Sequence, residues 1–360
     1  MLLDFLTLKP KAFGLDISDL SLKLIKLEKK QRGLGLACFG ETKVKSGIIE
    51  KGEINDEKAL VKIIKESLTQ VKGEKLKTKY VIASLPEEKA FLQVIKLPLM
   101  EEEEAKKAVY FEAENYIPLP IKDVYLDSQI ILKLHPQKQL YVLIAALPKK
   151  IVDPYVSVLK GAGLKPLALE IESQAISRAL IKDGVSPEPL LLIDLGENRA
   201  SFIIFSGYSL RFTSTIPISS QQFTDAIAKD LKIDLKQAET LKIKHGIGGD
   251  KGGKQNFKIL NPYLNDLADR IKECLDYYQT YASHEHHILN GHKLSKVLLC
   301  GGGANLKGLT NFLSLKLKLP VLIGNPWINI LPKPLPEVSG LSYQESLKYT
   351  TALGLALRGI

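Results

Sequence analysis

The chain has 360 residues, more than one compact core usually holds, so two or more domains are expected. Its 45% hydrophobic and 25% charged residues describe an ordinary globular protein. No apolar run approaches the roughly 20 residues of a membrane span, and the start, residues 1–10, lacks the basic leader of a secretory signal. With only Cys38, Cys274 and Cys300 there is no CxxC pair, which excludes a disulfide framework and favours a reducing, cytoplasmic compartment.

The formal net charge of +10 raises the question of a nucleic-acid partner, and the kind of basic residue argues against one. Nearly all basic residues are lysines spread along the whole chain. Arginine, the better bidentate reader of bases and phosphates, occurs only six times. We therefore expect no nucleic-acid partner. Weak attraction to an anionic membrane surface fits the charge better.

Segments of strand length that alternate or run apolar occur along the whole chain, with helical periods between them. The predicted strands are Ala12–Ile17, Ser21–Glu28, Gly35–Thr42, Tyr80–Ser84, Phe91–Leu97, Tyr125–Leu134, Tyr141–Ala146, Leu167–Ile171, Leu190–Leu195, Ser201–Phe205, Ser209–Ile216, Val297–Cys300 and Val321–Gly324. A long helix is predicted from about Pro262 to Ser283, and another over Glu102–Tyr116. The glycine-rich stretch Gly246–Lys254 reads as a flexible surface loop. This mixture predicts an α/β fold with hairpins as well as crossovers.

A strand that ends in Asp and is followed by a hairpin occurs twice. The first copy is Phe13–Ser18 and the second is Leu192–Glu197, about half the chain later. Such repetition indicates a duplicated, two-lobe fold.

The two hairpins have a clear chemical use. The backbone N–H groups of a tight turn can point at phosphate oxygens, and an Asp at the strand end can hold a hydrated Mg²⁺. Asp16 and Asp194 are the two candidates, and Lys23, one strand on from Asp16, supplies a cation for the same phosphates. Taken singly, each Asp is explained as well by a strand end that caps its turn.

A third motif supports the nucleotide interpretation. A buried strand, Val297–Cys300, is followed by three glycines, Gly301 to Gly303, and then by a helix. Glycines allow the backbone to approach a flat ligand closely, and a helix N-terminus favours anions. A simple turn from strand to helix needs one glycine rather than three.

Taken together, these motifs resemble the PilM family of type IV pilus assembly proteins, in the FtsA-like branch of the actin/Hsp70/sugar-kinase ATPase superfamily. The resemblance covers nearly the whole chain. It is carried by Gly14–Ile17, Lys96–Pro98, Glu112–Pro118, Tyr125–Asp127, Ala238–Lys242, Gly301–Ala304, Asn325–Pro326 and Ala352–Arg358. It implies a duplicated, actin-like (ribonuclease H-like) ATPase fold with an FtsA-like insertion.

The resemblance also implies ATP and Mg²⁺ as cofactors. It makes Asp16 and Asp194 catalytic residues that hold the metal through water, and it places the residue that positions the attacking water at Gln174, with Glu172 as competitor. The implied nucleotide-binding residues are Ser18, Lys23, Gly196, Glu197, Glu239, Lys242, Gly301, Gly302, Gly303 and Asn305. For Glu239 and Lys242, one helical turn apart, a surface salt bridge is an equally good explanation.

The sequence departs from the family pattern at two places. Ser18 stands where the first hairpin usually has glycine, and Ser219 and Ser220 stand where paired glycines are usual. Ser219 and Gln222 still fit a capping box for the following helix. We therefore expect nucleotide binding but slow or absent hydrolysis.

An FtsA-like layout would divide the chain into four subdomains. The expected limits are 11–83 with 150–188 for subdomain 1A, 84–149 for the insertion 1C, 189–231 with 295–360 for 2A, and 232–294 for 2B.

The family role is that of a cytoplasmic adaptor in the inner-membrane complex of a type IV pilus or a related secretion or competence machine. The resemblance implies recruitment by the N-terminal tail of a bitopic, PilN-type membrane protein, with ATP bound between the lobes. Glu112 and Tyr116 in the insertion are the candidate partner contacts. Packing of 1C on 1A explains Glu112 nearly as well.

Three rival functions stay open at this point: a sugar or acetate kinase, a polymerising protein like FtsA, and a scaffold that binds no nucleotide. No convincing substrate set for a kinase stands in the first half of the chain. The histidines His284, His286, His287 and His292 could suggest a metal site, but a solvated helix end explains them better.

Overall fold

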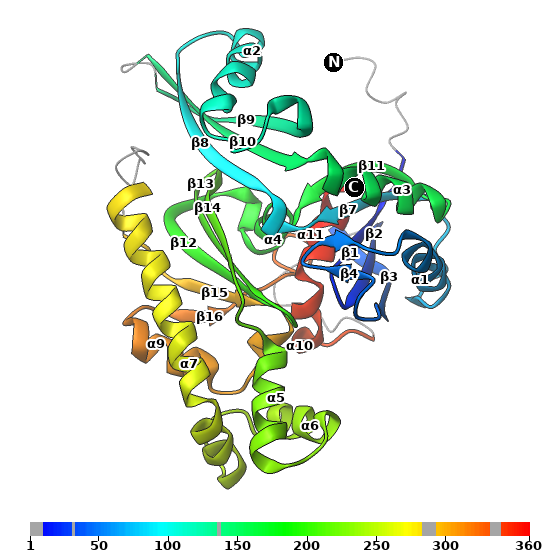
Figure 1. Cartoon of the computed structure of the whole chain (residues 1–360), viewed down its shortest axis with the longest axis vertical. Helices are drawn as coiled ribbons and strands as arrows, with labels where there is room; N and C mark the ends of the chain where they lie inside the picture. Colours follow the sequence, from blue (N-terminus) through cyan, green and yellow to red (C-terminus); the bar gives the residue numbers. More distant parts are fainter. Residues whose placement is uncertain (1–9, 31–32, 135–137, 283–292, 332–339) are drawn as a thin grey trace.

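The computed structural model describes residues 10–30, 33–134, 138–282, 293–331 and 340–360. Within these residues, three sheets of three or more strands surround two central helices (Figure 1). The predicted α/β architecture, with both hairpins and crossovers, is confirmed. The histidines at 284–292 lie outside the described residues, as does the segment 332–339.

The first sheet has six strands in the order β11-β7-β1-β2-β3-β6. These are β1 (Phe13–Ile17), β2 (Ser21–Lys30), β3 (Gly33–Lys43), β6 (Lys72–Gly73), β7 (Tyr80–Leu85) and β11 (Lys165–Ile171). The hairpin β1–β2 is antiparallel, whereas β7 runs parallel to β1. Helices α1 (Glu57–Thr69) and α3 (Lys149–Gly161) pack their apolar residues on one face of the sheet. We call this sheet and its helices the first lobe.

The second sheet repeats this design. Its five strands have the order β14-β13-β12-β15-β16, with β12–β13 antiparallel and β15 parallel to β12. These are β12 (Ser186–Leu195), β13 (Ala200–Gly207), β14 (Ser209–Ile216), β15 (Val297–Cys300) and β16 (Val321–Ile323). Four helices accompany it: α5 (Ser220–Leu231), α6 (Leu235–His245), α7 (Lys251–Tyr277) and α9 (Leu309–Leu317). We call this unit the second lobe; its likeness to the first confirms the predicted duplication.

The third sheet is inserted between β7 and β11 of the first lobe. It is antiparallel, with the order β8-β10-β9, and helix α2 lies over one of its faces (Figure 1). Its elements are β8 (Phe91–Pro98), α2 (Glu102–Glu112), β9 (Val124–Leu134) and β10 (Gln139–Pro148). The other face contributes Val94, Tyr141 and Leu143 to an apolar cluster shared with the second lobe. The subdomain limits given above stay a prediction.

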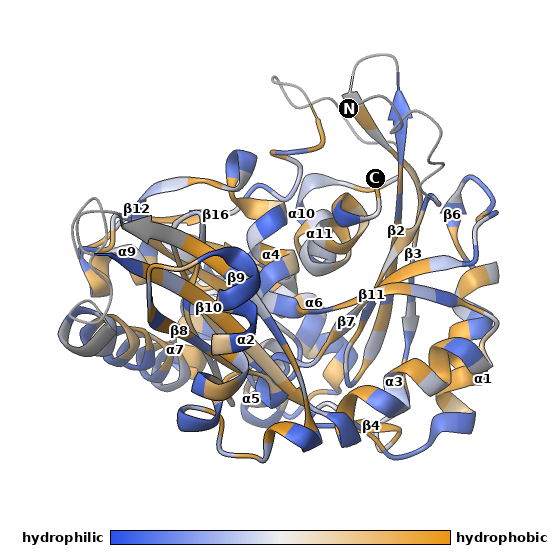
Figure 2. Cartoon of the chain, turned by 90° about the horizontal axis from the view of Figure 1, so that it is seen from above, coloured by the Kyte–Doolittle hydropathy of each residue, from blue (hydrophilic) through white to orange (hydrophobic). Residues whose placement is uncertain are grey.

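Two helices lie between the lobes: α4 (Glu172–Leu180) and the C-terminal α11 (Thr350–Arg358). Seen from above, they stand between the strands of the first sheet and those of the second (Figure 2). Their backbones touch at Gly354, where an added Cβ would overlap the carbonyl oxygen of Ala175. On its other side, α11 meets β1 at Gly14, where a Cβ would overlap the backbone of Ala352. Glycine is therefore required at both contacts.

The expectation of a flexible loop over Gly246–Lys254 is wrong in part, because α7 begins at Lys251. The physical reason is a helix cap: the carboxylate of Asp250 accepts a hydrogen bond of 2.7 Å from the N–H of Gly253. Two consecutive glycines inside a first turn hide this signal, since glycine alone favours a turn.

We predict that Gly354→Ala destabilises the chain, because the added methyl group must push two closely packed helices apart. Overpacking of this kind usually costs about 1–3 kcal/mol, and a backbone contact gives little room for relief. Thermal unfolding of wild type and variant measures the effect. Gly248→Ala is the matched control, since no atom of the described residues lies within 4 Å of a Cβ there. Equal unfolding temperatures for the two variants would contradict the packing argument.

Candidate functional site

The first hairpin holds Asp16 in a defined polar setting. Asp16 pairs with Lys23 across β1 and β2, and the Lys23 Nζ lies 4.0 Å from the Asp16 carboxylate. The Ser84 hydroxyl at the end of β7 donates a 3.1 Å hydrogen bond to Asp16 and accepts one of 2.8 Å from the N–H of Ile17. Ser18 bonds within its own turn, donating to the carbonyl of Ser21 at 3.0 Å. The hydroxyl of Ser18 therefore serves the turn itself.

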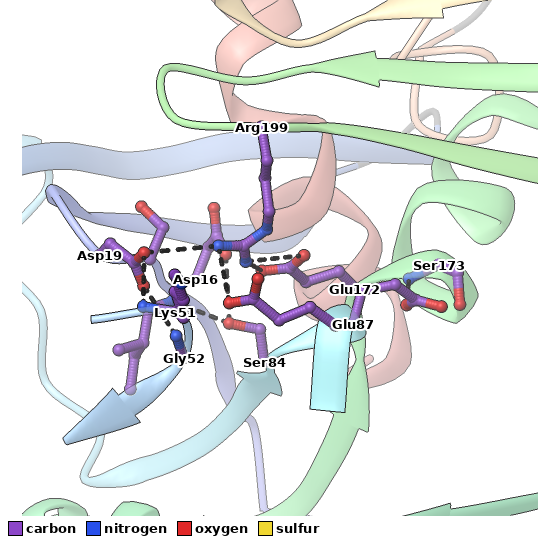
Figure 3. A network of polar contacts seen from close by, with 12 residues as sticks. Asp16, Asp19, Lys51, Gly52, Ser84, Glu87, Glu172, Ser173 and Arg199 are labelled. Carbon is purple, nitrogen blue, oxygen red and sulfur yellow. Dashed lines mark hydrogen bonds and ion pairs between the residues drawn. The ribbon is translucent and has the colours of Figure 1, made fainter. Parts of the chain in front are cut away.

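Arg199 in the second hairpin reaches across to the first lobe. Figure 3 shows its guanidinium between Asp19, in the first hairpin, and Glu172, at the start of α4. The guanidinium lies 3.7 Å from the Asp19 carboxylate, 3.1 Å from that of Glu172 and 3.4 Å from that of Glu88. Its side chain is only 14% exposed. One buried cation therefore joins three separate segments of the first lobe to the second.

The N-terminus of α4 is capped from outside the helix. Its N-cap residue, Ile171, has no side chain that can accept a hydrogen bond. Instead, the buried carboxylate of Glu87 accepts a 2.9 Å hydrogen bond from the N–H of Ser173. Its other oxygen, Oε1, has no hydrogen-bond partner within the described residues. Burial raises the pKa of Glu87. A buried oxygen without a partner is a place where a hydrated cation or water would bind.

Acidic groups outnumber cations in this region. We call the whole set the polar cluster: Asp16, Asp19, Lys23, Glu87, Glu88, Glu172, Asp194 and Arg199. Burial raises the pKa of Asp16 against the opposing effect of Lys23. Burial and the nearby Asp16 raise the pKa of Asp194 to about 6. For Glu172 burial raises the pKa, and the Arg199 guanidinium opposes that rise.

A surplus of buried carboxylates calls for protons or for a divalent cation. Within the described residues no three Asp, Glu, His or Cys side chains form a ready metal site. Mg²⁺ prefers oxygen ligands, keeps several waters and takes few direct protein ligands. The donor chemistry of the cluster therefore fits Mg²⁺ held through water and phosphate.

The three glycines bring β15 against the second hairpin. Gly301 has φ of +81°, and a Cβ there would overlap the Asp194 carboxylate. A Cβ on Gly303 would lie 2.6 Å from Cγ of Leu195. At Gly302, by contrast, the Lys348 side chain, at 3.8 Å, is the only described neighbour within 4 Å of an added Cβ. Two of the three glycines are therefore required by packing, and the third is open to a ligand.

The side chain of Asn305, just beyond the glycines, makes a hydrogen bond within the protein. Its side-chain amide donates a 2.9 Å hydrogen bond to the carbonyl of Gln344.

Glu239 and Lys242 connect α6 to the start of α5. Lys242 is 5% exposed, lies 2.7 Å from the Glu239 carboxylate and donates a 2.7 Å hydrogen bond to Thr224. Its Nζ also donates to the carbonyl of Ser220 at 3.0 Å. The Ser220 N–H in turn donates to the carbonyl of Gly196 in the second hairpin. The pair is therefore more than a surface salt bridge, although Glu239 stays 44% exposed.

The start of α5 is held by a predicted capping box and by a backbone contact with the second hairpin. The predicted capping box of Ser219 and Gln222 is confirmed at the start of α5. The carbonyl of Glu197 accepts a 3.1 Å hydrogen bond from the N–H of Gln221, which ties the hairpin to that same helix start.

Gln174 does not belong to the polar cluster. It lies in the wall of a cavity of about 510 Å³. The cavity is bordered by the insertion, by α4 and by the turn between β13 and β14. Inside it, buried Glu170 pairs with Arg178 and with Arg358, the latter at 3.2 Å. The lining residues that we use below are Asp127, Ala145, Gln174, Ser177, Arg178, Ser209 and Arg358. We call this space the cavity.

Two hydroxyl groups in the cavity wall have no hydrogen-bond partner among the described residues. The hydroxyls of Ser177 and Ser209 are buried, and neither has a hydrogen-bond partner within the described residues. Buried polar groups normally find partners, so their presence in a cavity indicates a polar ligand or ordered water.

The two predicted partner contacts lie outside this cavity. Glu112 is the last residue of α2, and Tyr116, 46% exposed, follows shortly after. Both stand on the insertion, and neither is among the residues that line the cavity. Their role in partner binding stays a prediction.

Sequence reasoning missed Arg199, Asp19, Glu87 and Glu88. Their contacts join segments far apart in the chain, which local patterns do not reveal. One signal was available: Arg199 is one of only six arginines and stands inside a candidate phosphate hairpin.

Comparison with known proteins identifies close structural relatives. Residues 14–360 match the family model of the type IV pilus assembly protein PilM. Over 98% of this chain and 99% of the other, the chain is similar to a solved PilM-PilN type IV pilus biogenesis complex, with 26% identity and a TM-score of 0.80.

More distant relatives share the fold. MreB5 of Spiroplasma citri bound to AMPPNP has a TM-score of 0.55 at 13% identity, with 98% of this chain and 96% of that chain covered. The cell division protein FtsA of Escherichia coli (strain K12) is 21% identical over 85% of this chain and 80% of its own length. The expected actin-like ATPase fold is thereby confirmed. No helix in the described ranges is long and apolar enough to cross a bilayer.

We predict that the pH dependence of stability changes in Asp194→Asn. Because the pKa of Asp194 is raised from 3.8 to about 6, the folded chain keeps a proton that the unfolded chain releases between these values. The folded state therefore loses relative stability as pH rises through this window. The advantage of Asp194→Asn over wild type should grow between about pH 4 and pH 6.5, by up to roughly 2 kcal/mol.

Thermal unfolding in EDTA measures that difference. Asp230→Asn, an exposed change on α5, is the control and should track wild type at every pH. If the stability of Asp194→Asn also runs parallel to wild type, the raised pKa is refuted.

Proposed function

Because the chain belongs to the PilM family of type IV pilus assembly proteins, we propose that it is a cytoplasmic, nucleotide-binding adaptor of an inner-membrane pilus assembly complex. In this proposal it binds Mg-ATP between its lobes and is recruited by the N-terminal tail of a PilN-type membrane protein. The main support for nucleotide binding is that both Asp hairpins contribute to one polar cluster, in which acidic groups outnumber cations.

The roles of the nucleotide-binding residues follow from their places in the fold. Asp16 and Asp194 would hold Mg²⁺ through water, and Lys23 and Arg199 are the cations available to phosphate oxygens. The metal would neutralise phosphate charge. Gly302 offers open space at the glycine turn, and the Glu239–Lys242 pair is anchored to the second hairpin through α5. These two features support adenosine recognition on the second lobe.

We also propose that ATP hydrolysis is slow or absent. Glu172, rather than Gln174, contacts the polar cluster, so we propose Glu172 as the residue nearest the reacting phosphate. In the structure its carboxylate is held by Arg199. While Arg199 occupies this carboxylate, the carboxylate is not free to accept a proton from an attacking water, which agrees with weak hydrolysis.

The cavity supports the recruitment part. It lies where the insertion meets α4 and the β13–β14 turn, no residue of the polar cluster is among its lining residues, and a relative with a TM-score of 0.80 is described as a PilM-PilN complex. An extended tail could satisfy the hydroxyls of Ser177 and Ser209 and bond to Arg178 or Asp127. Its affinity should be modest, because a disordered tail loses conformational entropy on binding.

We predict a Mg²⁺-dependent rise of the unfolding temperature with ATP. A ligand at about 100 times its Kd adds roughly 2.7 kcal/mol to the free energy of unfolding, which is a shift of several degrees. Asp194→Ala should lose most of the shift, and Asp230→Ala should keep it. If wild type shows no shift in millimolar Mg-ATP, or the same shift in EDTA, the nucleotide proposal is wrong.

We predict that a synthetic N-terminal peptide of a PilN-type protein binds in the cavity. Ala145→Trp fills this space without changing its charge, so it should weaken peptide binding at least tenfold while the Mg-ATP shift is kept. The double variant Glu112→Lys, Tyr116→Ala tests the exposed end of α2 instead. Loss of binding in that variant alone would move the partner site from the cavity to α2.

A further inference from the structure

Five lysines gather at one end of the first sheet. Strands β1, β7 and β11 run parallel to each other, so their first residues lie at the same end of the sheet. Strand β2 is antiparallel to β1 and therefore brings its second half to that end. We call this set of residues the lysine patch: Lys11, Lys26, Lys77, Lys79 and Lys165.

Hydrogen bonds hold the segments of the lysine patch side by side. The carbonyl of Lys79 accepts a 2.8 Å hydrogen bond from the N–H of Lys165. The carbonyl of Lys11 accepts one of 2.8 Å from the hydroxyl of Thr78, and Lys77 and Lys79 flank that threonine. Lysines from segments that are far apart in the sequence therefore belong to one surface.

Lys26 completes the lysine patch from β2. Its Nζ donates a 2.7 Å hydrogen bond to the carbonyl of Ala12, next to Lys11. Burial and the nearby Lys11 both lower the pKa of Lys26. The other four lysines of the patch are exposed.

The charge of the lysine patch is not balanced by carboxylates of the described residues. The lysines that form ion pairs there all lie outside the patch. Lys165 lies instead over the ring of Tyr80, with its Nζ 5.8 Å from the ring centre. Like charges without counter-charges repel each other, so this surface attracts an anionic partner.

Exposed apolar side chains accompany the lysines. Leu167, two residues beyond Lys165 on β11, is 47% exposed, and β11 is an outer strand of its sheet. Ile360 is also exposed, and the preceding residue, Gly359, accepts a hydrogen bond from the N–H of Ala12. Basic and apolar side chains on one surface fit the interface of an anionic bilayer, where lysine stems and apolar groups meet lipid and the amines meet headgroups.

The lysine patch adjoins the cavity proposed for the partner's tail. Strand β11 joins Lys165 to Glu170 inside the cavity, over roughly 16 Å at the usual rise of a strand. On the other side, Arg358 in the cavity wall is followed directly by Gly359, which bonds to Ala12. A tail that continues into a membrane brings the surface around the cavity close to the headgroups.

We propose that the lysine patch binds the anionic phospholipid headgroups of the membrane directly, as a second contact beside the partner's tail. The choice of a membrane rests on the proposed function, whereas the binding needs neither nucleotide nor tail. Each lysine near an anionic surface contributes about fivefold in affinity, which corresponds to about 1 kcal/mol. A bound tail would reinforce this contact, because it keeps the lysines at high local concentration near the lipid.

Co-sedimentation of the full chain with lipid vesicles tests this contact in the absence of any partner. Wild type should bind vesicles with about 40% phosphatidylglycerol at low salt, should be released by high salt and should not bind pure phosphatidylcholine. The triple variant Lys11→Gln, Lys79→Gln, Lys165→Gln should bind about tenfold more weakly or less, because three of the five charges are lost.

The matched control removes three exposed lysines from α6 and α7 of the second lobe: Lys236→Gln, Lys254→Gln, Lys258→Gln. It lowers the net charge by the same amount and should bind vesicles as wild type does. Both triple variants should keep the unfolding temperature of wild type, since all substituted side chains are exposed.

Four results would overturn the proposal: equal losses in the two triple variants, no binding of wild type to phosphatidylglycerol vesicles, equal binding to phosphatidylcholine, or tighter binding of the lysine patch to duplex DNA than to vesicles. Peptide binding in the cavity is measured separately from vesicle binding. A chain that binds the peptide and not the vesicles keeps the adaptor function and loses the lipid contact. A chain that binds the vesicles and not the peptide keeps the lipid contact and loses the recruitment by a tail.

Discussion

Arg199 brings one positive charge from the second lobe into a set of carboxyl groups that belongs mainly to the first. Without it, Asp19, Glu88 and Glu172 would face each other partly buried and without a counter-charge. An unpaired buried charge is expensive, so the approach of the two lobes depends on this contact. The same contact also affects ligand binding. An anion that enters must compete with the carboxylates for Arg199, and a divalent cation must compete with Arg199 for the carboxylates.

The duplicated fold explains why the Arg199 contact joins so many segments of the chain. Each lobe ends a buried strand in Asp and turns into a hairpin, and the pairing of β1 with β7 is repeated by β12 with β15. The two hairpins consequently meet at the junction of the lobes, where α4 and α11 lie between the sheets. Gly14 and Gly354 allow this packing, because only an absent side chain lets α11 rest on β1 and on α4.

Much of the fold was predictable because its signals are local. All thirteen predicted strands are present, since their apolar residues match a buried strand. Contacts also join the two Asp hairpins to each other and the glycine turn to the second hairpin. The strands β4 (Ile49–Glu50), β5 (Glu53–Ile54) and β6 have two residues each and leave no periodic signal. Arg199 and Glu87 escaped prediction for a different reason: their partners are distant in sequence, and only the tertiary fold brings them together.

Glu172 and Gln174 show that sequence reasoning can locate a site on the right helix and still not choose the residue that faces it. Residues two apart on a helix point about 200° away from each other, so only one of them can face a given site. The family resemblance located the right helix start, and the structure turns Glu172 toward the polar cluster and Gln174 toward the cavity. A hydrophobic pattern does not resolve this choice, because both residues are polar and stand in the first turn of α4.

The central claim is that nucleotide binds between the two hairpins in exchange for the Arg199 contacts. A crystal structure of the chain with Mg-AMPPNP tests it most directly. The account predicts phosphates between the hairpins, Mg²⁺ near Asp16 and Asp194, and the Arg199 guanidinium on a phosphate oxygen instead of on Glu172. Nucleotide bound elsewhere, or bound with the Arg199–Glu172 ion pair intact, would contradict it.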